Sequence, residues 1–333
     1  MKKENKIIYS GMQPTGELHL GNYFGALRNF VSLQSKYKSY FTIVDLHSLA
    51  TDYDPKEKQK QVLNLAMDYL AMGLDPKKCT IFVQSHVPEV TELAWIFNTI
   101  TPISELERMT QFKDKALVQK QNVNIGLFDY PILQAADILL FKADIVPVGL
   151  DQVQHVELTR TIAKKFNTKF GETFKLPEAL LTEAPRIMSL TEPLKKMSKS
   201  LGAKSYIALN DGPDVIKAKL AKAVTEPTGV INIEKAKTNA GMRGAYNLLE
   251  MLNLFGNKRA FNKFNNQNKI KYKELKETVA DEIIEHFHLF RRKKALLEKD
   301  PIKVKKILLA GAKHASKQAQ ATMADVRKKV GIR

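Results

Sequence analysis

Residues 6–23 read KIIYSGMQPTGELHLGNY, and this stretch decides the fold class. Residues 6–10 predict a short buried strand, and the glycines and proline that follow predict a turn. Apolar positions at helical spacing then predict a helix over residues 20–37. The free N–H groups at the start of such a helix favour a phosphate group, so the stretch predicts a strand, a turn and a phosphate-binding helix start.

The same alternation of strand and helix continues to about residue 166. Expected strands cover residues 40–44, 80–84 and 145–148, and expected helices cover residues 54–72, a segment from about 89, 131–141 and 152–166. This order predicts an α/β fold with a Rossmann-like, doubly wound parallel sheet. Sheets of this kind bind ligands beyond the carboxyl ends of their strands.

Beyond about residue 205 only helical spacing remains. It recurs in residues 213–224, 244–255, 274–290 and 302–330, which predicts a C-terminal all-helical domain. We therefore expect two domains, 1–205 and 206–333.

Charge follows a similar division. The chain has 53 Lys+Arg against 35 Asp+Glu, a net charge of +18. Residues 1–190 have a net charge of +1 and residues 191–333 of +17. A neutral first part and a basic second part favour a polyanionic partner for the second, such as RNA. Biased lysine usage is the competing explanation, but it does not account for the neutral first part.

Composition excludes several other classes of protein. A single cysteine, Cys79, excludes an internal disulfide and a cysteine-rich metal site. No run approaches the ~18 apolar residues of a membrane helix, and the N-terminus lacks a signal-peptide core. We expect a cytoplasmic protein without a membrane partner or a protein-bound metal site.

The turn after the first strand contains His19, Gly21 and Asn22. Gly21 has no side chain, so a flat base could approach the backbone there. His19 and Asn22 could donate hydrogen bonds to phosphate oxygens as charge develops. A structural histidine that begins an ordinary helix is the competing interpretation.

A second motif, KKMSKS, covers residues 195–200. It is either a solvated basic loop or a loop whose ammonium groups contact a triphosphate. Two lysines on departing pyrophosphate would lower the barrier to its release.

A third candidate lies in residues 130–140. Tyr130, Gln134 and Asp137 share one helical face at i, i+4 and i+7. A carboxylate on an apolar helix needs a partner, and one buried carboxylate could accept the single N–H of an indole. Val146 and Val148 on the next strand could form apolar walls around the ring.

The two motifs resemble the HIGH and KMSKS signatures of class I aminoacyl-tRNA synthetases, with Asn22 in place of the last histidine. Residues 105–115 and 146–155 resemble the tryptophan-specific members of that family. The resemblance runs from about residue 6 to 205 and continues more weakly beyond.

The resemblance implies a site for each substrate. His19, Asn22, Lys196 and Lys199 would be catalytic. Asp137 would accept the indole N–H, and Tyr130 and Gln152 would hold the α-amino group. The tryptophan pocket would comprise Asp137, Tyr130, Gln134, Gln152, Tyr9, Val146 and Val148. The ATP site would comprise Gln13, Pro14, Thr15, Gly21, Asn22, Lys113, Lys115, Gly149, Leu150, Asp151, Ile187, Lys196, Met197, Ser198, Lys199 and Ser200.

The implied activity is activation of L-tryptophan with ATP and Mg²⁺, followed by transfer to tRNA(Trp). Residues 206–333 would bind the tRNA anticodon, and the protein would be a homodimer with residues 84–112 as the candidate interface.

Departures from the family pattern keep other functions open. Gln134 stands where many members have Met, Leu150 where Glu is usual, Tyr9 where Phe is common, and Leu201 where Asp often follows the lysine motif. The Tyr130-Gln134-Asp137 pattern also occurs in tyrosine-specific relatives, so tyrosine is the alternative substrate. A nucleotidyltransferase that does not act on tRNA and a catalytically inactive RNA-binding protein are the remaining alternatives.

Overall fold

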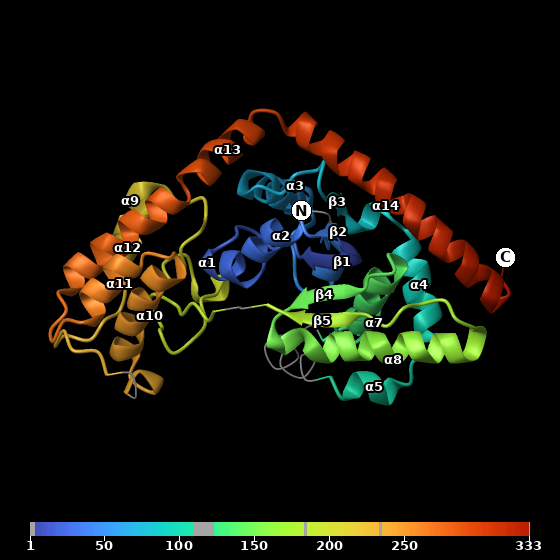
Figure 1. Ribbon diagram of the computed structural model, residues 1–333, viewed down its shortest axis with the longest axis horizontal. Helices are drawn as coiled ribbons and strands as arrows, with labels where there is room; N and C mark the ends of the chain where they lie inside the picture. Colours follow the sequence, from blue (N-terminus) through green and yellow to red (C-terminus); the bar gives the residue numbers. More distant parts are fainter. Residues whose placement is uncertain (1–3, 110–122, 183–184, 233–234, 333) are drawn as a thin grey trace. The chain divides into compact units, whose positions relative to one another are not determined.

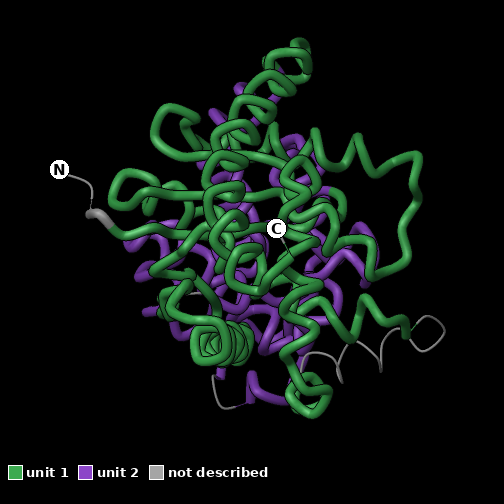
Figure 2. Tube along the Cα trace, turned by 90° about the vertical axis from the view of Figure 1, so that its right-hand side faces the viewer, with its two compact units in different colours: residues 1–16, 26–183, 296–333 green, residues 17–25, 184–295 purple. Residues whose placement is uncertain are grey.

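The computed structural model describes residues 4–109, 123–182, 185–232 and 235–332, and these form two compact units. Unit 1 comprises residues 1–16, 26–183 and 296–333, and unit 2 comprises residues 17–25 and 184–295. Figure 2 colours unit 1 green and unit 2 purple. These units do not follow the expected division at residue 205, because the chain leaves unit 1 for nine residues at the first motif and returns to it at residue 296.

Unit 1 is built on a sheet of five parallel strands in the order β3-β2-β1-β4-β5 (Figure 1). The strands are β1 Glu4–Met12, β2 Tyr37–Ile43, β3 Thr80–Val83, β4 Ile145–Val148 and β5 Glu178–Leu181. The expected α/β fold with a parallel sheet is therefore confirmed. β5 was not expected, because its four residues are only partly buried and lack a run of β-branched or aromatic side chains.

Helices and single turns connect these strands. They are α2 Arg28–Leu33, α3 Pro55–Met72, α4 Glu89–Asn98, α5 Ile103–Glu107, α7 Ile125–Leu140 and α8 Val153–Phe170. Short 3-10 turns cover Leu46–Ala50, Gln84–His86 and Leu150–Gln152.

The sequence defines both ends of α3. The Asp54 carboxylate accepts a hydrogen bond from the Lys56 N–H at 2.9 Å, and Pro55 occupies the first turn. Gly73 ends the helix at φ +112°, a left-handed conformation that glycine adopts without steric cost. The helix predicted over residues 54–72 is confirmed.

The helix predicted over residues 20–37 is shorter and irregular. It consists of α1 Leu20–Asn22, a π-helical turn Tyr23–Leu27 and α2, which ends at Leu33. The side chain of Gln34 turns back to donate to the carbonyl groups of Val31 (3.1 Å) and Gly73 (3.0 Å). These bonds satisfy helix-end and neighbouring carbonyls, so the chain can leave the helix and enter β2 at Tyr37.

α7 begins six residues before the expected start at Pro131. The side chain of Asn124 caps it by accepting from the Leu127 N–H at 2.9 Å, and Pro131 lies inside the helix. Asparagine is a strong helix N-cap, which explains the earlier start. Behind α7, Phe141 stacks on Tyr9 and Tyr40, with ring centroids 5.5 and 4.9 Å apart, so aromatic packing fixes the middle of the sheet.

Unit 2 is mainly helical. Its helices are α1, α9 Pro213–Ala221, α10 Ala240–Leu254, α11 Lys258–Asn265, α12 Tyr272–His286 and most of α13 His288–Glu298, with a 3-10 turn at Lys235–Lys237. The expected helical character of this region is confirmed. α10 packs tightly against the segment at Val224. Gly244 faces the Val224 carbonyl group, where a Cβ atom would lie only 2.0 Å from the oxygen.

The last helix, α14 Pro301–Val330, belongs to unit 1 (Figure 2). The Thr322 hydroxyl donates to the Leu140 carbonyl at 2.8 Å, and Arg327 forms an ion pair with Glu92. Gly311 lies so close to β3 that a Cβ atom there would be 1.9 Å from the Ile81 carbonyl oxygen. α14 is therefore an integral layer of unit 1.

We expect Gly311→Ala to destabilise the protein by about 1–3 kcal/mol, because an added methyl group must push α14 away from β3. Chemical denaturation measures this directly. Ala310→Gly, one position away on the exposed side of the helix, is the control and should cost only about 1 kcal/mol through helix propensity. A Gly311→Ala protein as stable as the wild type would contradict this packing.

Candidate active site

The first signature motif forms a helix start in unit 2. His19 caps α1, where its Nδ1 accepts a hydrogen bond from the Gly21 N–H at 3.1 Å. Asn22 completes a reciprocal capping box, because its Oδ1 accepts from the His19 N–H at 3.1 Å. A Cβ atom on Gly21 would lie 2.9 Å from the His19 ring, so this packing requires glycine.

These caps decide which atoms can donate. Because the His19 Nδ1 accepts a hydrogen bond, the proton of the neutral ring is on Nε2, which is then a donor. Because the Asn22 Oδ1 also accepts, the Asn22 amide nitrogen is directed elsewhere as a donor. The motif thus presents two side-chain donors, as stabilisation of phosphate charge requires.

The charge state of His19 depends on its surroundings. Burial, followed by the positive charges of Lys199 and Lys196, lowers the pKa of His19 to about 4. We expect the ring to be neutral at pH 7, and NMR titration of its Cε1–H should give a midpoint near 4. Since the unfolded histidine titrates near ~6.5, this group should reduce stability as the pH falls from ~6.5 towards 4.

Replacing Lys199 by methionine should raise the His19 pKa, since one of the two cations is removed. His288, an exposed histidine in the same unit, is the internal control in the same spectra. A His19 midpoint near 6.5 in the wild type would contradict the burial and the lysine contacts.

The second signature motif is a loop anchored at one residue. Met197 is 2 % exposed and its N–H donates to the Ile187 carbonyl at 2.9 Å. The Ser189 N–H donates to the Lys195 carbonyl at 2.9 Å, and Asn247 of α10 holds both backbone groups of Met188. The methionine is thus the buried anchor of an otherwise polar loop.

After Met197 the loop turns sharply. Ser198 caps a 3-10 turn, Lys199–Leu201, and the Ser205 hydroxyl donates to the carbonyl groups of Ser198 (2.9 Å) and Gly202 (2.7 Å). Lys196 is exposed and Lys199 is half-buried. Burial lowers the pKa of Lys199, and the carboxylate of Glu17 partly opposes that shift.

Unit 2 brings the two motifs together. The chain on either side of His19 pairs with residues just beyond the lysine loop: the Leu20 N–H donates to Ile207 at 3.1 Å, and the Leu209 N–H donates to Leu18 at 2.8 Å. The His19 ring also lies against Tyr206, with centroids 5.8 Å apart. The two motifs therefore form a single cationic, donor-rich site with Lys196 and Lys199.

In unit 1, Asp137 is the centre of a buried polar cluster. It is 2 % exposed, and its carboxylate accepts from His47 Nε2 at 2.8 Å and from Gln84 Nε2 at 2.8 and 2.9 Å. The three hydrogen bonds fix the orientation of this buried carboxylate.

Aromatic and apolar residues surround this cluster. Tyr130 is hydrogen-bonded to His155 at 2.9 Å, and burial raises the pKa of Tyr130 to about 12. Burial, then the negative charge of Asp137, raises the pKa of Tyr9 well above its ordinary value. Val146 and Val148 are buried on β4.

The remaining expected site residues are less tightly held. Gln134 and Gln152 are half-buried, and Gln152 donates to Asp151 at 3.2 Å. Leu150 is 80 % exposed, and Gly149 precedes it at the end of β4. Gln13, Pro14 and Thr15 follow β1 in unit 1, whereas Ile187 is buried in unit 2. Lys113 and Lys115 lie outside the described residues.

Sequence reasoning missed three residues of the buried cluster, His47, Gln84 and His155. A signal for the first two was present: Gln84 directly follows β3, and His47 lies four residues after the end of β2. Polar residues after neighbouring parallel strands meet at the ligand-binding edge of the sheet. His155 carried no comparable signal, because its partner Tyr130 is 25 residues away on another helix.

Comparisons agree with this architecture. A family model described as tRNA synthetases class I (W and Y) matches residues 1–288. The tryptophan–tRNA ligase of Clostridium acetobutylicum is 43% identical over 335 residues, with 100% of this chain and 98% of the relative covered. That of Caldanaerobacter subterraneus is 44% identical over 332 residues, with 98% of each covered.

Solved structures give the same result. Tryptophanyl-tRNA synthetase from Campylobacter jejuni complexed with ADP and tryptophan is 34% identical, with a TM-score of 0.83 over 98% of this chain and 99% of that one. The Mycoplasma pneumoniae tryptophanyl-tRNA synthetase is 32% identical, with a TM-score of 0.84 over 98% of each chain. Tyrosyl-tRNA synthetase from Archaeoglobus fulgidus, 21% identical with a TM-score of 0.67 over 88% of this chain and 90% of that one, shares the fold.

None of the helices in the described part of the chain combines the length and apolar character that a membrane span requires. The family match covers most of the sequence, both signature motifs lie together, and relatives above 40% identity extend over the whole chain. The chain belongs to the class I tRNA synthetases of the tryptophan and tyrosine group.

Proposed function

We propose that the chain is a tryptophan–tRNA ligase that uses ATP to activate L-tryptophan and then loads it onto tRNA(Trp). The observation that carries the proposal is the buried Asp137 carboxylate, which His47 and Gln84 orient as a hydrogen-bond acceptor. An indole has one N–H donor. Relatives over 40% identical are named tryptophan–tRNA ligases, which supports the same substrate.

In the first step, a tryptophan carboxylate oxygen attacks the α-phosphorus of ATP, and pyrophosphate leaves. The carboxylate is already a nucleophile, so positioning and charge stabilisation supply most of the acceleration. We assign the catalytic donors to His19 Nε2, the Asn22 amide, Lys196 and Lys199. In the second step a terminal ribose hydroxyl of the tRNA attacks the activated carbonyl group, and AMP leaves.

The substrate contacts follow the same assignment. Asp137 accepts the indole N–H, Tyr130 and Gln152 hold the α-amino group, and Tyr9, Gln134, Val146 and Val148 complete the tryptophan pocket. ATP contacts are Gln13, Pro14, Thr15, Gly21, Asn22, Lys113, Lys115, Gly149, Leu150, Asp151, Ile187 and residues 196–200.

Mg²⁺ is proposed to accompany ATP, because triphosphate oxygens are ligands that this cation prefers. Within the described ranges, no group of three or more His, Cys, Asp or Glu side chains is arranged to hold a metal ion. The cation would therefore rely mainly on the nucleotide, while the protein adds positive charge through Lys196 and Lys199.

Three further properties complete the proposal, and the first rests on exposed apolar side chains. Trp95 and Ile103, on α4 and α5, are 70 % and 67 % exposed, and large exposed apolar side chains favour a protein interface. We infer a homodimer through residues 84–112, which light scattering of the wild type and a Trp95→Glu variant would test. We further propose that residues 206–333 contribute the tRNA anticodon-binding surface and that the protein acts in the cytoplasm.

Amino-acid-dependent ATP–pyrophosphate exchange across all twenty amino acids tests the central proposal. Exchange with tryptophan alone supports it. Exchange with tyrosine alone would keep the chemistry and overturn the pocket assignment. Exchange with none would overturn the enzyme assignment and favour an RNA-binding protein.

A further inference from the structure

α14 has two chemically different faces. The buried face contains small and apolar residues that pack in unit 1, among them Leu308, Ala315 and Ala319. The helix as a whole carries eight Lys and Arg residues but a single acidic residue, Asp325. Such an imbalance on one helix marks a candidate surface for an anionic partner.

Two cations near the end of α14 form ion pairs within the fold. Arg327 pairs with Glu92, while Lys329 pairs with Asp325 at 3.0 Å and also donates to Thr173 at 2.8 Å. The cations further up the helix behave differently. Lys303, Lys306, Lys313 and Lys317 are exposed, and none of them forms an ion pair with another residue of the described ranges.

These four lysines define what we call the α14 stripe. Their spacings of three, seven and four residues place them on one side of the helix. At ~1.5 Å of rise per residue, Lys303 and Lys317 are about 21 Å apart along the axis. A row of cations of this length can follow several consecutive phosphates of a nucleic-acid backbone.

A pocket of about 440 Å³ is partly lined by α14 and adds cations from elsewhere in the chain. Its walls include His314 of α14, Lys38 at the start of β2, and Lys77 and Lys78 just before β3. These residues lie at the amino ends of β2 and β3, whereas His47 and Gln84 follow their carboxyl ends. The pocket is therefore separate from the buried polar cluster around Asp137.

Lysine-rich composition alone does not explain this concentration. Residues 1–190 are nearly neutral although they belong to the same lysine-rich chain. The four stripe lysines recur on a single side of α14, and the pocket gathers further cations from two distant segments. Repulsion among them is a cost that a bound polyanion would relieve.

We propose that the α14 stripe and its pocket bind the phosphate backbone of tRNA. The surface offers ammonium groups without base-reading geometry, so it positions the RNA and does not select its sequence. The choice of tRNA as the polyanion rests on the proposed function. Binding here would add a contact surface on unit 1 to any that unit 2 provides.

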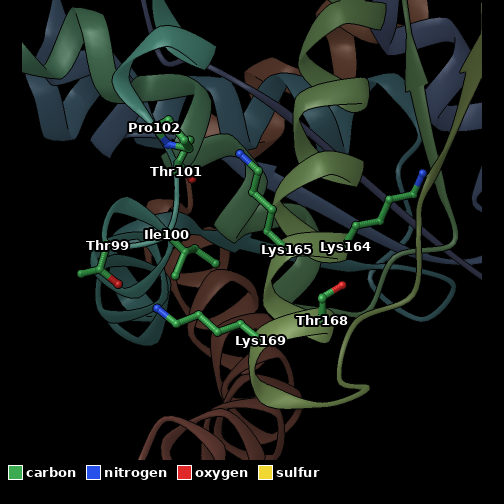
Figure 3. A pocket seen from close by; sticks show the side chains of 8 residues that line it. All are labelled: Thr99, Ile100, Thr101, Pro102, Lys164, Lys165, Thr168 and Lys169. Atoms are coloured by element: carbon green, nitrogen blue, oxygen red, sulfur yellow. The ribbon is translucent and has the colours of Figure 1, made fainter.

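Another lysine cluster of unit 1 supplies a matched control. Lys164, Lys165 and Lys169 of α8 line a pocket of about 620 Å³ together with Thr99, Ile100 and Pro102 (Figure 3). There Lys165 pairs with Glu105 at 3.4 Å, so a carboxylate offsets part of the charge. Lys164 and Lys169 are exposed, like the stripe lysines, and can be removed as a pair.

The experiment compares Lys313→Gln/Lys317→Gln with Lys164→Gln/Lys169→Gln. Each variant loses two positive charges from one helix of unit 1, and glutamine retains helix propensity. Binding of a tRNA(Trp) transcript is measured by filter retention between about 50 and 200 mM salt. Circular dichroism confirms folding, and tryptophan-dependent exchange without tRNA reports on the active site.

We expect the stripe variant to show a salt dependence shallower by about two in log–log slope, one for each lost phosphate contact. The α8 variant should match the wild type, and both should retain full exchange activity. An unchanged stripe variant, or equal losses in the two variants, would overturn the proposal. Binding to phosphatidylglycerol vesicles is measured in parallel. A stripe variant that binds these vesicles less well than the wild type but binds tRNA normally would also overturn the proposal.

The same data separate this inference from the proposed function. A wild type without exchange activity, whose RNA affinity still depends on the stripe, would remove the enzyme assignment and leave the α14 surface established. Normal exchange activity, together with RNA binding that does not depend on the stripe, would support the enzyme assignment and overturn the α14 surface.

Discussion

Lys199→Ala is expected to slow tryptophanyl-adenylate formation by at least ~10²-fold, the range seen when a transition-state donor is lost. Lys199 lies in the 3-10 turn after the Met197 anchor, half-buried and close enough to His19 to affect its titration. We propose that its ammonium group meets the charge that develops as pyrophosphate leaves. Pre-steady-state measurement of ATP consumption with saturating tryptophan gives the rate, and equilibrium dialysis should show little change in tryptophan affinity.

Lys195→Ala is the matched control in the same loop. Lys195 is exposed and pairs with Glu192 at 2.6 Å, so its loss removes a charge without removing a proposed phosphate contact. Wild-type rates in Lys199→Ala, or equal defects in both variants, would refute the assignment of Lys199.

Asp137→Asn is expected to lower the selectivity for tryptophan over phenylalanine by roughly 10²-fold or more. A site built to hydrogen-bond a substrate N–H discriminates strongly against analogues that lack it. In the variant, an amide replaces one acceptor oxygen and brings N–H groups towards the donors of His47 and Gln84. The ratio of the kcat/KM value for tryptophan to that for phenylalanine in the exchange assay measures this selectivity.

Asp129→Asn on the same helix controls for a general loss of charge. Asp129 accepts from Asn98 at 3.0 Å, outside the buried cluster around Asp137. Selectivity should change in Asp137→Asn and stay constant in Asp129→Asn. If Asp137→Asn discriminates as the wild type does, the indole does not bind where we propose.

Much of unit 1 could be predicted because local signals agreed with the final packing. Asp54, Pro55 and Gly73 define α3 through local capping, and β2, β3 and β4 each contain a buried run of mainly apolar residues. The signature motifs were also readable, since glycine at position 21 and a capping histidine at position 19 are local requirements. Their meeting in unit 2 depends on backbone pairing of residues 18–20 with 207–209, which sequence spacing does not reveal.

Other features depend on contacts between distant residues. The periodicity of residues 302–330 predicted a helix, but not that Gly311 and Thr322 would seat it on the strands and helices of unit 1. The partners of Asp137 are 90 and 53 residues away in sequence. Only a three-dimensional arrangement shows that this carboxylate is already oriented before a ligand arrives.

The return of α14 to unit 1 has a consequence for biosynthesis. β3 and its neighbours are synthesised early, yet the helix that packs on them, Pro301–Val330, is made much later. Residues 184–295 are complete before that, so much of unit 2 can form while unit 1 still lacks a layer. A chain that stops near residue 300 would therefore leave the parallel sheet of unit 1 as the unfinished and aggregation-prone part.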